Sequence, residues 1–324
     1  MIEKIYIYES SSFDPYHNIA AEKYLLEHVQ PGCCILYLWQ NEHTVVIGRN
    51  QNAWLECRTS LLEQEGGHLA RRLSGGGAVY HDLGNLNFTF LVPDEDYDVD
   101  KQLSVIQTAC RQLGIRVEKS GRNDLLANGQ KFSGNAFYHS QGKAYHHGTL
   151  LVSANMEKLS RYLTPPKAKL EAKGVQSVRS RVTNLADLCP DLTIEGLKKQ
   201  LAKAFSAVYG PAPERLQLDA DAAAQIDGDA TALATWDWLY GPRLPFSFSC
   251  EGRFDWGHIL IQLQIESGRI TNADIYSDSM DWLLPEQLKN ALTGCRFSLP
   301  DMEKALANLS VHQDICALLE LQNI

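Results

Sequence analysis

A run of three consecutive glycines, Gly75 to Gly77, most constrains what this chain can form, because it follows Arg71 and Arg72 and precedes the sequence Ala78-Val79-Tyr80-His81-Asp82. Residues without side chains let backbone N–H groups turn toward an anion at close range, and arginine adds a fixed positive charge. A flexible hairpin turn is the plainer interpretation. A turn, however, needs neither two arginines nor a flanking His-Asp pair, so the segment predicts a phosphate-binding loop.

Two familiar phosphate-binding motifs are excluded. A P-loop needs Gly-Lys followed by Ser or Thr, but Gly142-Lys143 is followed by Ala144. A dinucleotide-binding fingerprint needs a third glycine where Tyr80 stands. The chain is therefore neither a P-loop enzyme nor a Rossmann dehydrogenase.

A second segment places a lysine on a predicted hairpin. Asn128-Gly129 between apolar residues is a strong hairpin signal, and it puts Lys131 early on the returning strand, after Asn123 and Asp124. Such a lysine can reach a phosphate or carbonyl oxygen as a positive point charge. The plainer interpretation is a solvated surface lysine, which the small residues that follow Lys131 disfavour.

A third segment contains two adjacent histidines, His146 and His147, on a predicted strand. Neighbouring residues of a strand point to opposite faces, so one of the two faces a site. A metal site is disfavoured, because no other His or Cys stands at ligand spacing and the eight cysteines include no C-x-x-C pair.

These three segments, in this order and spacing, resemble the lipoate–protein ligase family. The resemblance extends to Gly48-Arg49-Asn50-Gln51-Asn52, to residues 173–184 and to Trp236, and covers essentially the whole chain. One departure is the short loop between Asp124 and Lys131. The resemblance implies that lipoate and ATP give lipoyl-AMP and pyrophosphate. The lipoyl group then passes to a lysine of a carrier, either a lipoyl domain of a 2-oxoacid dehydrogenase complex or the glycine cleavage H protein.

The resemblance also assigns roles to residues. Lys131 would act in catalysis by contacting the acyl carbonyl oxygen and the α-phosphate, Asn123 and Asp124 would assist at the phosphates, Asp124 through Mg²⁺, and the acyl pocket would include Val79 and Ala136. The nucleotide and adenylate would be held or lined by Arg72, Gly75, Gly76, Gly77, Ala78, Val79, Tyr80, His81 and His147. Carboxylate attack on a phosphate joins two anions, so fixed cations and backbone donors lower the barrier and no side-chain nucleophile is required.

Residues 166–182 form a basic unit with a local charge of +4, which includes Lys173, Arg179 and Arg181. A solvated charged face is the plainer interpretation. In the family this segment covers the bound adenylate, so a lid that excludes water is expected.

Three alternatives remain open. A related octanoyltransferase would use a site cysteine instead of ATP, yet no cysteine lies between Cys110 and Cys189. A biotin–protein ligase would have a different glycine-rich motif. A protein that binds lipoate without catalysis would have no use for a phosphate loop.

The predicted fold is α+β, with a mixed, largely antiparallel sheet flanked by helices over residues 1–242 and a smaller α/β domain over residues 249–324, joined by a Pro- and Gly-containing linker near 241–245. Residues 244–324 hold eleven acidic and five basic side chains against twenty-eight and twenty-five in the rest, which is consistent with this boundary. Strands are expected at 5–8, 34–39, 44–47 and 87–92, with 34–39 and 44–47 forming a hairpin, and later at 253–265 and 270–276. Helices are expected at 15–29, 103–113 and 193–209 and from 285 and 301, while 219–229 is expected to be solvated and poorly specified.

Charge and hydropathy restrict the kinds of partner and the cellular location that are expected for this protein. A net charge of −9 argues against a general nucleic-acid binder, and no stretch reaches eighteen consecutive apolar residues. A charged start, with Glu3 and Lys4, does not fit a signal peptide. A cytoplasmic monomer that contacts no membrane is expected.

Overall fold

A computed structural model describes residues 2–51, 53–121, 124–163, 182–240, 248–266 and 269–322. The strands of its large sheet are β1 (Lys4–Glu9), β2 (Cys33–Trp39), β6 (Asn85–Pro93), β7 (Val117–Ser120), β8 (Asp124–Ala127), β9 (Gln130–Ser140), β10 (Lys143–Leu151) and β11 (Glu214–Arg215). A small sheet contains β3 (Thr44–Ile47), β4 (His68–Arg71) and β5 (Val79–His81), and a C-terminal sheet contains β12 (Phe248–Phe254), β13 (Gly257–Glu266) and β14 (Arg269–Ser277). The helices are α1 (Pro15–His28), α2 (Ala53–Glu56), α3 (Thr59–Gln64), α4 (Val99–Gln112), α5 (Met156–Tyr162), α7 (Ile194–Tyr209), α8 (Ala220–Leu233), α9 (Trp236–Tyr240), α10 (Leu284–Leu292), α11 (Leu299–Leu306) and α12 (His312–Glu320).

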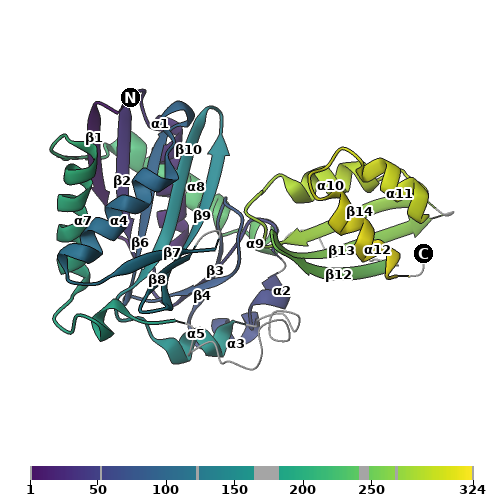
Figure 1. The fold of residues 1–324 in the computed structure, drawn as a ribbon, viewed down its shortest axis with the longest axis horizontal. Coiled ribbons are helices and arrows are strands. Elements are labelled where there is room, and N and C mark those ends of the chain that lie inside the picture. Colours follow the sequence, from purple (N-terminus) through teal and green to yellow (C-terminus); the bar gives the residue numbers. More distant parts are fainter. Residues whose placement is uncertain are drawn as a thin grey trace.

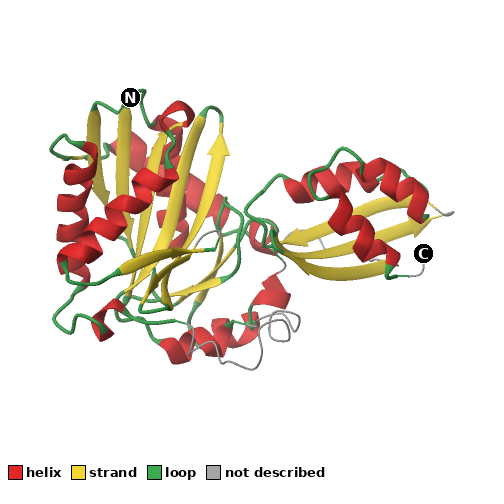
Figure 2. Ribbon diagram, in the orientation of Figure 1, coloured by secondary structure: helices red, strands yellow, loops and turns green. Residues whose placement is uncertain are grey.

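The large sheet has the strand order β11-β1-β2-β6-β10-β9-β8-β7. Only β11, β1 and β2 run parallel to one another, and every later pair from β2 to β7 is antiparallel. The predicted α+β class with a mixed, largely antiparallel sheet is confirmed (Figure 2).

The two faces of this sheet are covered by different helices. One face packs with α4 and α7 around a core that includes Phe88, Phe90 and Phe205. The other packs with α1 and α8 around Tyr37, Trp39 and Tyr145. Figure 1 shows α4 and α7 in front of the sheet, on the opposite side from α1 and α8. We call the face that packs against α1 the α1 face.

Local sequence signals account for several elements. Asp14 accepts hydrogen bonds from the first turn of α1, and Pro15 begins that helix, as predicted. Thr193 caps α7 in the same way. Asn128 and Gly129 have φ angles of 50° and 77°, the left-handed conformation of a type I′ turn, and connect β8 to β9. The predicted hairpin that carries Lys131 is therefore confirmed.

The hairpin predicted between residues 34–39 and 44–47 is wrong. β2 lies between β1 and β6 in the large sheet, whereas β3 lies between β4 and β5 in the small one. Both edges of β2 are occupied by strands distant in sequence, so the short polar connection moves the chain to another sheet.

The interpretation of residues 219–229 as poorly specified is also wrong, because residue 219 caps α8 and residues 220–229 belong to that helix. Asp219 caps this helix by accepting from the backbone N–H of Ala222. Ile226 and Leu233 are buried in the core beside α1. Alanine has the highest helix propensity, so the composition that suggested a solvated stretch instead favours a helix.

The C-terminal sheet is an antiparallel meander, β12-β13-β14, packed with α10, α11 and α12 around a core of its own. The segment predicted as one strand over 253–265 contains a turn and contributes to both β12 and β13. Helices from 285 and 301 are confirmed, and α12 was not predicted. Figure 1 shows this unit beside the large sheet, next to α9. The predicted linker at 241–245 lies outside the described residues.

In the described part of the chain, no helix combines the length and the apolar character needed to cross a membrane.

Candidate active site

The glycine-rich loop is held from within by the buried guanidinium of Arg72. Its nitrogens donate to Ser74 Oγ at 3.1 Å, to the Gly75 carbonyl at 2.7 and 3.1 Å, to the Gly77 carbonyl at 2.8 Å and to the Val46 carbonyl at 3.3 Å. Burial lowers the pKa of Arg72 to about 10, which still leaves it charged at neutral pH. The Arg72 side chain therefore fixes the shape of the loop.

Arg71 makes a similar set of bonds on the neighbouring side. Its guanidinium donates to the carbonyls of Gly48, Arg49 and Gln51 and to two carbonyls of α9. Two adjacent buried arginines thus connect the loop, the 48–51 segment and α9.

The glycines of the loop allow close approach of other backbone segments. A Cβ atom on Gly75 would lie 2.2 Å from the carbonyl oxygen of Ser279, and the Gly76 N–H donates to that same oxygen at 3.0 Å. On the other side, a Cβ on Gly48 would lie 2.2 Å from the Gly76 carbonyl oxygen. In this arrangement the segment after β14 covers one backbone donor of the loop.

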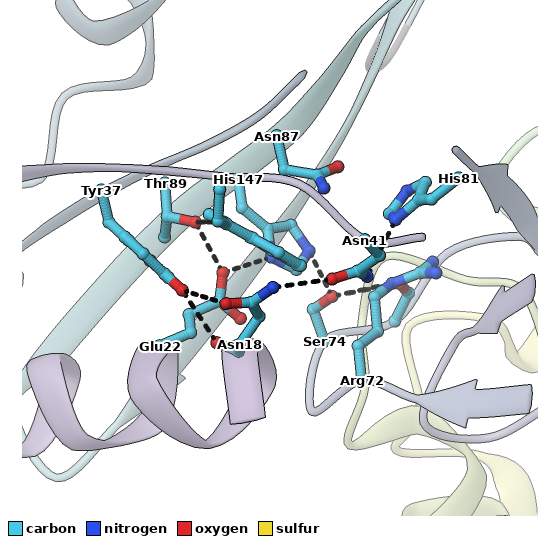
Figure 3. A network of polar contacts seen from close by, with 12 residues as sticks. Asn18, Glu22, Tyr37, Asn41, Arg72, Ser74, His81, Asn87, Thr89 and His147 are labelled. Carbon is cyan, nitrogen blue, oxygen red and sulfur yellow. Dashed lines mark hydrogen bonds and ion pairs between the residues drawn. The ribbon is translucent and has the colours of Figure 1, made fainter. Parts of the chain in front are cut away.

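A series of hydrogen bonds on the α1 face of the sheet connects the loop to α1. His147 Nε2 lies 2.8 Å from Ser74 Oγ, and His147 Nδ1 lies 2.8 Å from Glu22 Oε1. Thr89 Oγ1 donates to the same carboxylate oxygen at 2.7 Å. Figure 3 shows Glu22 on α1 and Ser74 on the loop, with the His147 ring between them. Glu22 is fully buried, and both partners contact Oε1, while Oε2 has no partner among the described residues, so the desolvation of this carboxylate is compensated only in part.

A second series of hydrogen bonds ends at His81. Asn18 donates through Nδ2 to Asn41 Oδ1 at 3.0 Å, and Asn41 Nδ2 lies 3.2 Å from His81 Nδ1. Burial is the main reason that the pKa of His81 is lowered to about 3, with Arg72 as a further cause. His81 is therefore a neutral imidazole at physiological pH.

Lys131 projects from β9 near the turn. Its Nζ lies 2.7 Å from Asp124 Oδ1, and the side chain stays partly exposed. A Cβ on Gly134 would lie 2.9 Å from Nζ, so this glycine gives the lysine room to cross the strand. Ala136, further along β9, pairs with His147 of β10.

His146 and His147 face opposite sides of β10, as predicted. His146 packs on the face covered by α4, where its two ring nitrogens lie within 3.1 Å of Gln102 Oε1 and 2.9 Å of Asn135 Oδ1. Burial lowers its pKa to about 3. His147 is therefore the histidine that faces the glycine loop.

The remaining predicted site residues lie around the glycine loop or outside the described residues. Val79 packs at the edge of the core beside α1, Tyr80 is buried in the small sheet, and Ala78 is partly buried beside it. Four predicted site residues lie outside the described residues: Asn123, Lys173, Arg179 and Arg181.

Sequence reasoning did not single out Glu22, Ser74 or Thr89, although all three belong to the hydrogen-bond chain. A signal for Glu22 exists in α1, where Asn18 and Glu22 are one turn apart among the apolar residues Ile19 and Leu25. A carboxylate on the buried side of a helix requires partners, which makes it a site candidate.

The described residues contain no group of three or more His, Cys, Asp or Glu side chains that could hold a metal ion. Asp124, predicted to act through Mg²⁺, is a single carboxylate already paired with Lys131. All eight cysteines are free, and burial raises the pKa of Cys57, Cys110 and Cys250 to about 12. Neither a resident metal nor an activated thiol is supported in this part of the chain.

Models of known protein families match most of the chain. The model for the lipoyl protein ligase A/B catalytic domain matches residues 14–206, and the model for the bacterial lipoate protein ligase C-terminus matches residues 244–324. The lipoate-protein ligase A of Psychrobacter cryohalolentis is 39% identical over 98% of this chain and 96% of its own.

Solved structures of such enzymes are similar as well. P. falciparum LipL1 in complex with lipoate has a TM-score of 0.84 and 27% identity, covering 97% of this chain and 98% of its own. A structure from an analysis of a bipartite lipoate protein ligase and its E2 lipoyl domain from Thermoplasma acidophilum has a TM-score of 0.66 and 25% identity, over 76% and 100%. A lipoate-protein ligase A bound with ATP has a TM-score of 0.65 and 25% identity, over 74% and 99%.

Proposed function

The chain belongs to the lipoyl protein ligase A/B family, and we propose that it is an ATP-dependent lipoate–protein ligase. It activates lipoate to lipoyl-AMP with release of pyrophosphate and then transfers the lipoyl group to a lysine of a carrier domain. Relatives solved with lipoate and with ATP support these two substrates.

One observation carries the proposal. The hydrogen bond between Ser74 and His147, at 2.8 Å, holds the glycine loop over the α1 face of β10. Lys131 leaves the neighbouring strand β9 with Nζ close to Gly134. The loop thus lies over β10 and the lysine leaves the adjoining strand β9, and this arrangement supports a reaction between a carboxylate and a phosphate at this place.

The barrier to the adenylation step is electrostatic. The lipoate carboxylate attacks the α-phosphate and pyrophosphate leaves, so negative charge gathers on the phosphate oxygens in the transition state. Lys131 is the cation proposed to lie between the acyl carbonyl oxygen and the α-phosphate. Its pairing with Asp124 at 2.7 Å keeps the ammonium in place before the substrates bind.

The glycine loop supplies backbone donors in this proposal. The sequence assigned Arg72 to the phosphates, but the five hydrogen bonds of its guanidinium go to the loop and to Val46. We therefore propose that Arg72 positions the loop. The backbone N–H groups of the glycine loop then face the phosphates, that of Gly76 once it leaves the Ser279 carbonyl, and His81 and His147 line the acyl side.

Transfer needs no enzyme nucleophile. The amine of the carrier lysine attacks the acyl carbonyl of lipoyl-AMP, an amide forms, and AMP leaves with the electron pair of the broken C–O bond. The octanoyltransferase alternative would need a reactive thiol, which the raised thiol pKa values of Cys57, Cys110 and Cys250 do not favour. Magnesium enters this proposal as part of the MgATP substrate.

The carrier is proposed to be a lipoyl domain of a 2-oxoacid dehydrogenase complex or the glycine cleavage H protein. The first is supported by the relative from Thermoplasma acidophilum described with its E2 lipoyl domain. We further propose that residues 1–242 and 249–324 are separate domains, because residues 250–319 contain a core of their own. The cytoplasmic location and the monomeric state stay predictions.

Lipoate-dependent pyrophosphate release from ATP tests the proposal, followed by transfer to an apo lipoyl domain detected by mass spectrometry. We expect AMP and lipoylated carrier in equal amounts. A protein that binds lipoate but releases no pyrophosphate would be the non-catalytic alternative. Transfer from an acylated carrier without ATP would identify the octanoyltransferase.

A further inference from the structure

Lys131 lies at an irregular position of β9. Leu126 of β8 pairs with Lys131, and the next pair along β8 is Leu125 with Ser133, so Phe132 is an extra residue on β9. Such a β-bulge interrupts the regular alternation of side chains between the two faces of a strand.

The bulge decides which face of the sheet Lys131 occupies. Ala136 pairs with His147, which faces the glycine loop, and Gly134 lies two residues before Ala136, so both belong to the α1 face. In a regular strand the side chain of Lys131 would point away from Gly134. Instead, a Cβ on Gly134 would lie 2.9 Å from Lys131 Nζ, and Phe132 is buried in the core beside α4. The position proposed for the lysine in the reaction therefore depends on the bulge.

A segment distant in sequence holds the backbone of Lys131. β10 pairs with β9 over residues 135–140. At Lys131, the same edge of β9 pairs with Val182 in a parallel bridge, and the Thr183 N–H donates to the Lys131 carbonyl at 2.9 Å. Leu126 on one side and Thr183 on the other thus fix the backbone from which the lysine projects.

The side chain of Asn184 fastens this segment to the end of β10. Its Oδ1 accepts from the Ala154 N–H at 2.9 Å and its Nδ2 donates to the Ala154 carbonyl at 3.0 Å, so one amide takes the place of a strand partner. The Ala186 N–H also donates to the Val152 carbonyl, at 3.0 Å. Residues 182–186 are therefore held between β9 and the continuation of β10.

We propose that Asn184 is a positioning residue for Lys131 in adenylation, an inference that rests on the proposed function. Loss of the Asn184 amide would detach the Thr183 backbone from β10, and the bulged backbone at Lys131 would gain freedom. The ammonium would then spend less time between the acyl carbonyl oxygen and the α-phosphate. A misplacement of about 1 Å can cost about a hundredfold in rate, so a looser lysine lowers kcat more than it weakens substrate binding.

Replacement of Asn184 by alanine tests the proposal through the kinetics of lipoate-dependent pyrophosphate release. We expect kcat to fall about tenfold while KM for lipoate and for ATP stays within about twofold. Asn155→Ala is the matched control, because this side chain also makes two hydrogen bonds to the backbone, from the N–H groups of Glu157 and Lys158 at the start of α5. Both variants lose two such bonds and should have similar stability in urea, but Asn155→Ala should keep kcat within about twofold.

A second measurement separates positioning from a general structural role. In the Lys131→Ala background, Asn184→Ala has no lysine left to position, so it should change the residual rate by less than about twofold. A loss that is equally large with and without Lys131 would contradict the proposal, because Asn184 would then act through another part of the site.

The remaining outcomes are decisive as well. A folded Asn184→Ala protein with normal kcat refutes the positioning role, while the ligase function stands. If Asn184→Ala does not fold, Asp187→Ala takes its place, since the Asp187 carboxylate is exposed and accepts from the Asn184 N–H at 3.2 Å. We expect Asp187→Ala to lower kcat about threefold, and only when Lys131 is present; an unchanged kcat overturns the proposal. Absence of lipoate-dependent pyrophosphate release from the unmodified protein refutes the proposed function, and this inference with it.

Discussion

Replacement of Arg72 by lysine separates two roles that this buried arginine could have. A phosphate ligand would tolerate lysine in part, since the positive charge is kept. A side chain that holds the loop together would not, because the flat guanidinium donates five hydrogen bonds to Ser74, Gly75, Gly77 and Val46.

The magnitude follows from these bonds. An ammonium group has three N–H donors, so at least two of the five bonds are lost in Arg72→Lys. A hydrogen bond from a charged donor contributes about 1.5–3 kcal/mol, which gives a loss of about 3–6 kcal/mol in the free energy of unfolding. Burial of the site means that solvent does not replace the missing partners.

Urea denaturation of the full chain, followed by circular dichroism, measures this loss, and lipoate-dependent pyrophosphate release at varied ATP measures its effect on the loop. Arg215→Lys is the control, because the Arg215 side chain is 80% exposed and forms an ion pair with Glu9. It should change stability by less than about 0.5 kcal/mol. If Arg72→Lys is within about 1 kcal/mol of the unmodified protein by the same measurement, far below the expected loss of about 3–6 kcal/mol, the loop is not held by this guanidinium.

Three further changes test other parts of the site. Lys131→Ala should slow lipoyl-AMP formation on the order of a hundredfold or more while lipoate binding changes less, as measured by pyrophosphate exchange and calorimetry; near-normal exchange would remove this lysine from the reaction. Stability should fall as the pH is lowered from 6.5 toward 3, because unfolded histidine takes up a proton near 6.5 whereas burial keeps His81 and His146 neutral until about 3. Each contributes a slope of about 1.4 kcal/mol per pH unit, and His146→Gln should make the urea midpoint less dependent on pH across this window. Trp282→Ala removes a ring that lies 5.0 Å from the Arg49 guanidinium and so loosens the segment whose Ser279 carbonyl accepts from the glycine loop. A severalfold tighter Kd for ATP is expected by calorimetry, and an unchanged Kd would mean that this segment and ATP do not compete.

Several features of the fold are encoded over a few residues and could be predicted from the sequence. Asp14-Pro15 starts a helix because the carboxylate caps it and proline fits its first turn. Asn128-Gly129 forms a hairpin because both residues accept positive φ. This local turn is also why Lys131 could be placed on a strand before the structure was known.

The glycine loop could be recognised as a site, but the role of its arginine could not. A basic residue beside three glycines is compatible both with binding an anion and with bonding to the carbonyls of the loop. The choice depends on where the side chain points. The structure turns Arg72 inward, toward carbonyls of its own loop and of β3.

By itself, the sequence determined the fold class, the main helices, the turn before Lys131 and the opposite orientation of His146 and His147, since each depends on neighbouring residues and on the period of a strand or helix. Only the tertiary structure decided that β2 and β3 belong to different sheets and that Glu22 and Ser74 share one histidine. The physical reason is that strand pairing and the satisfaction of buried polar groups depend on partners far apart along the chain, which packing of the two sheet faces brings together.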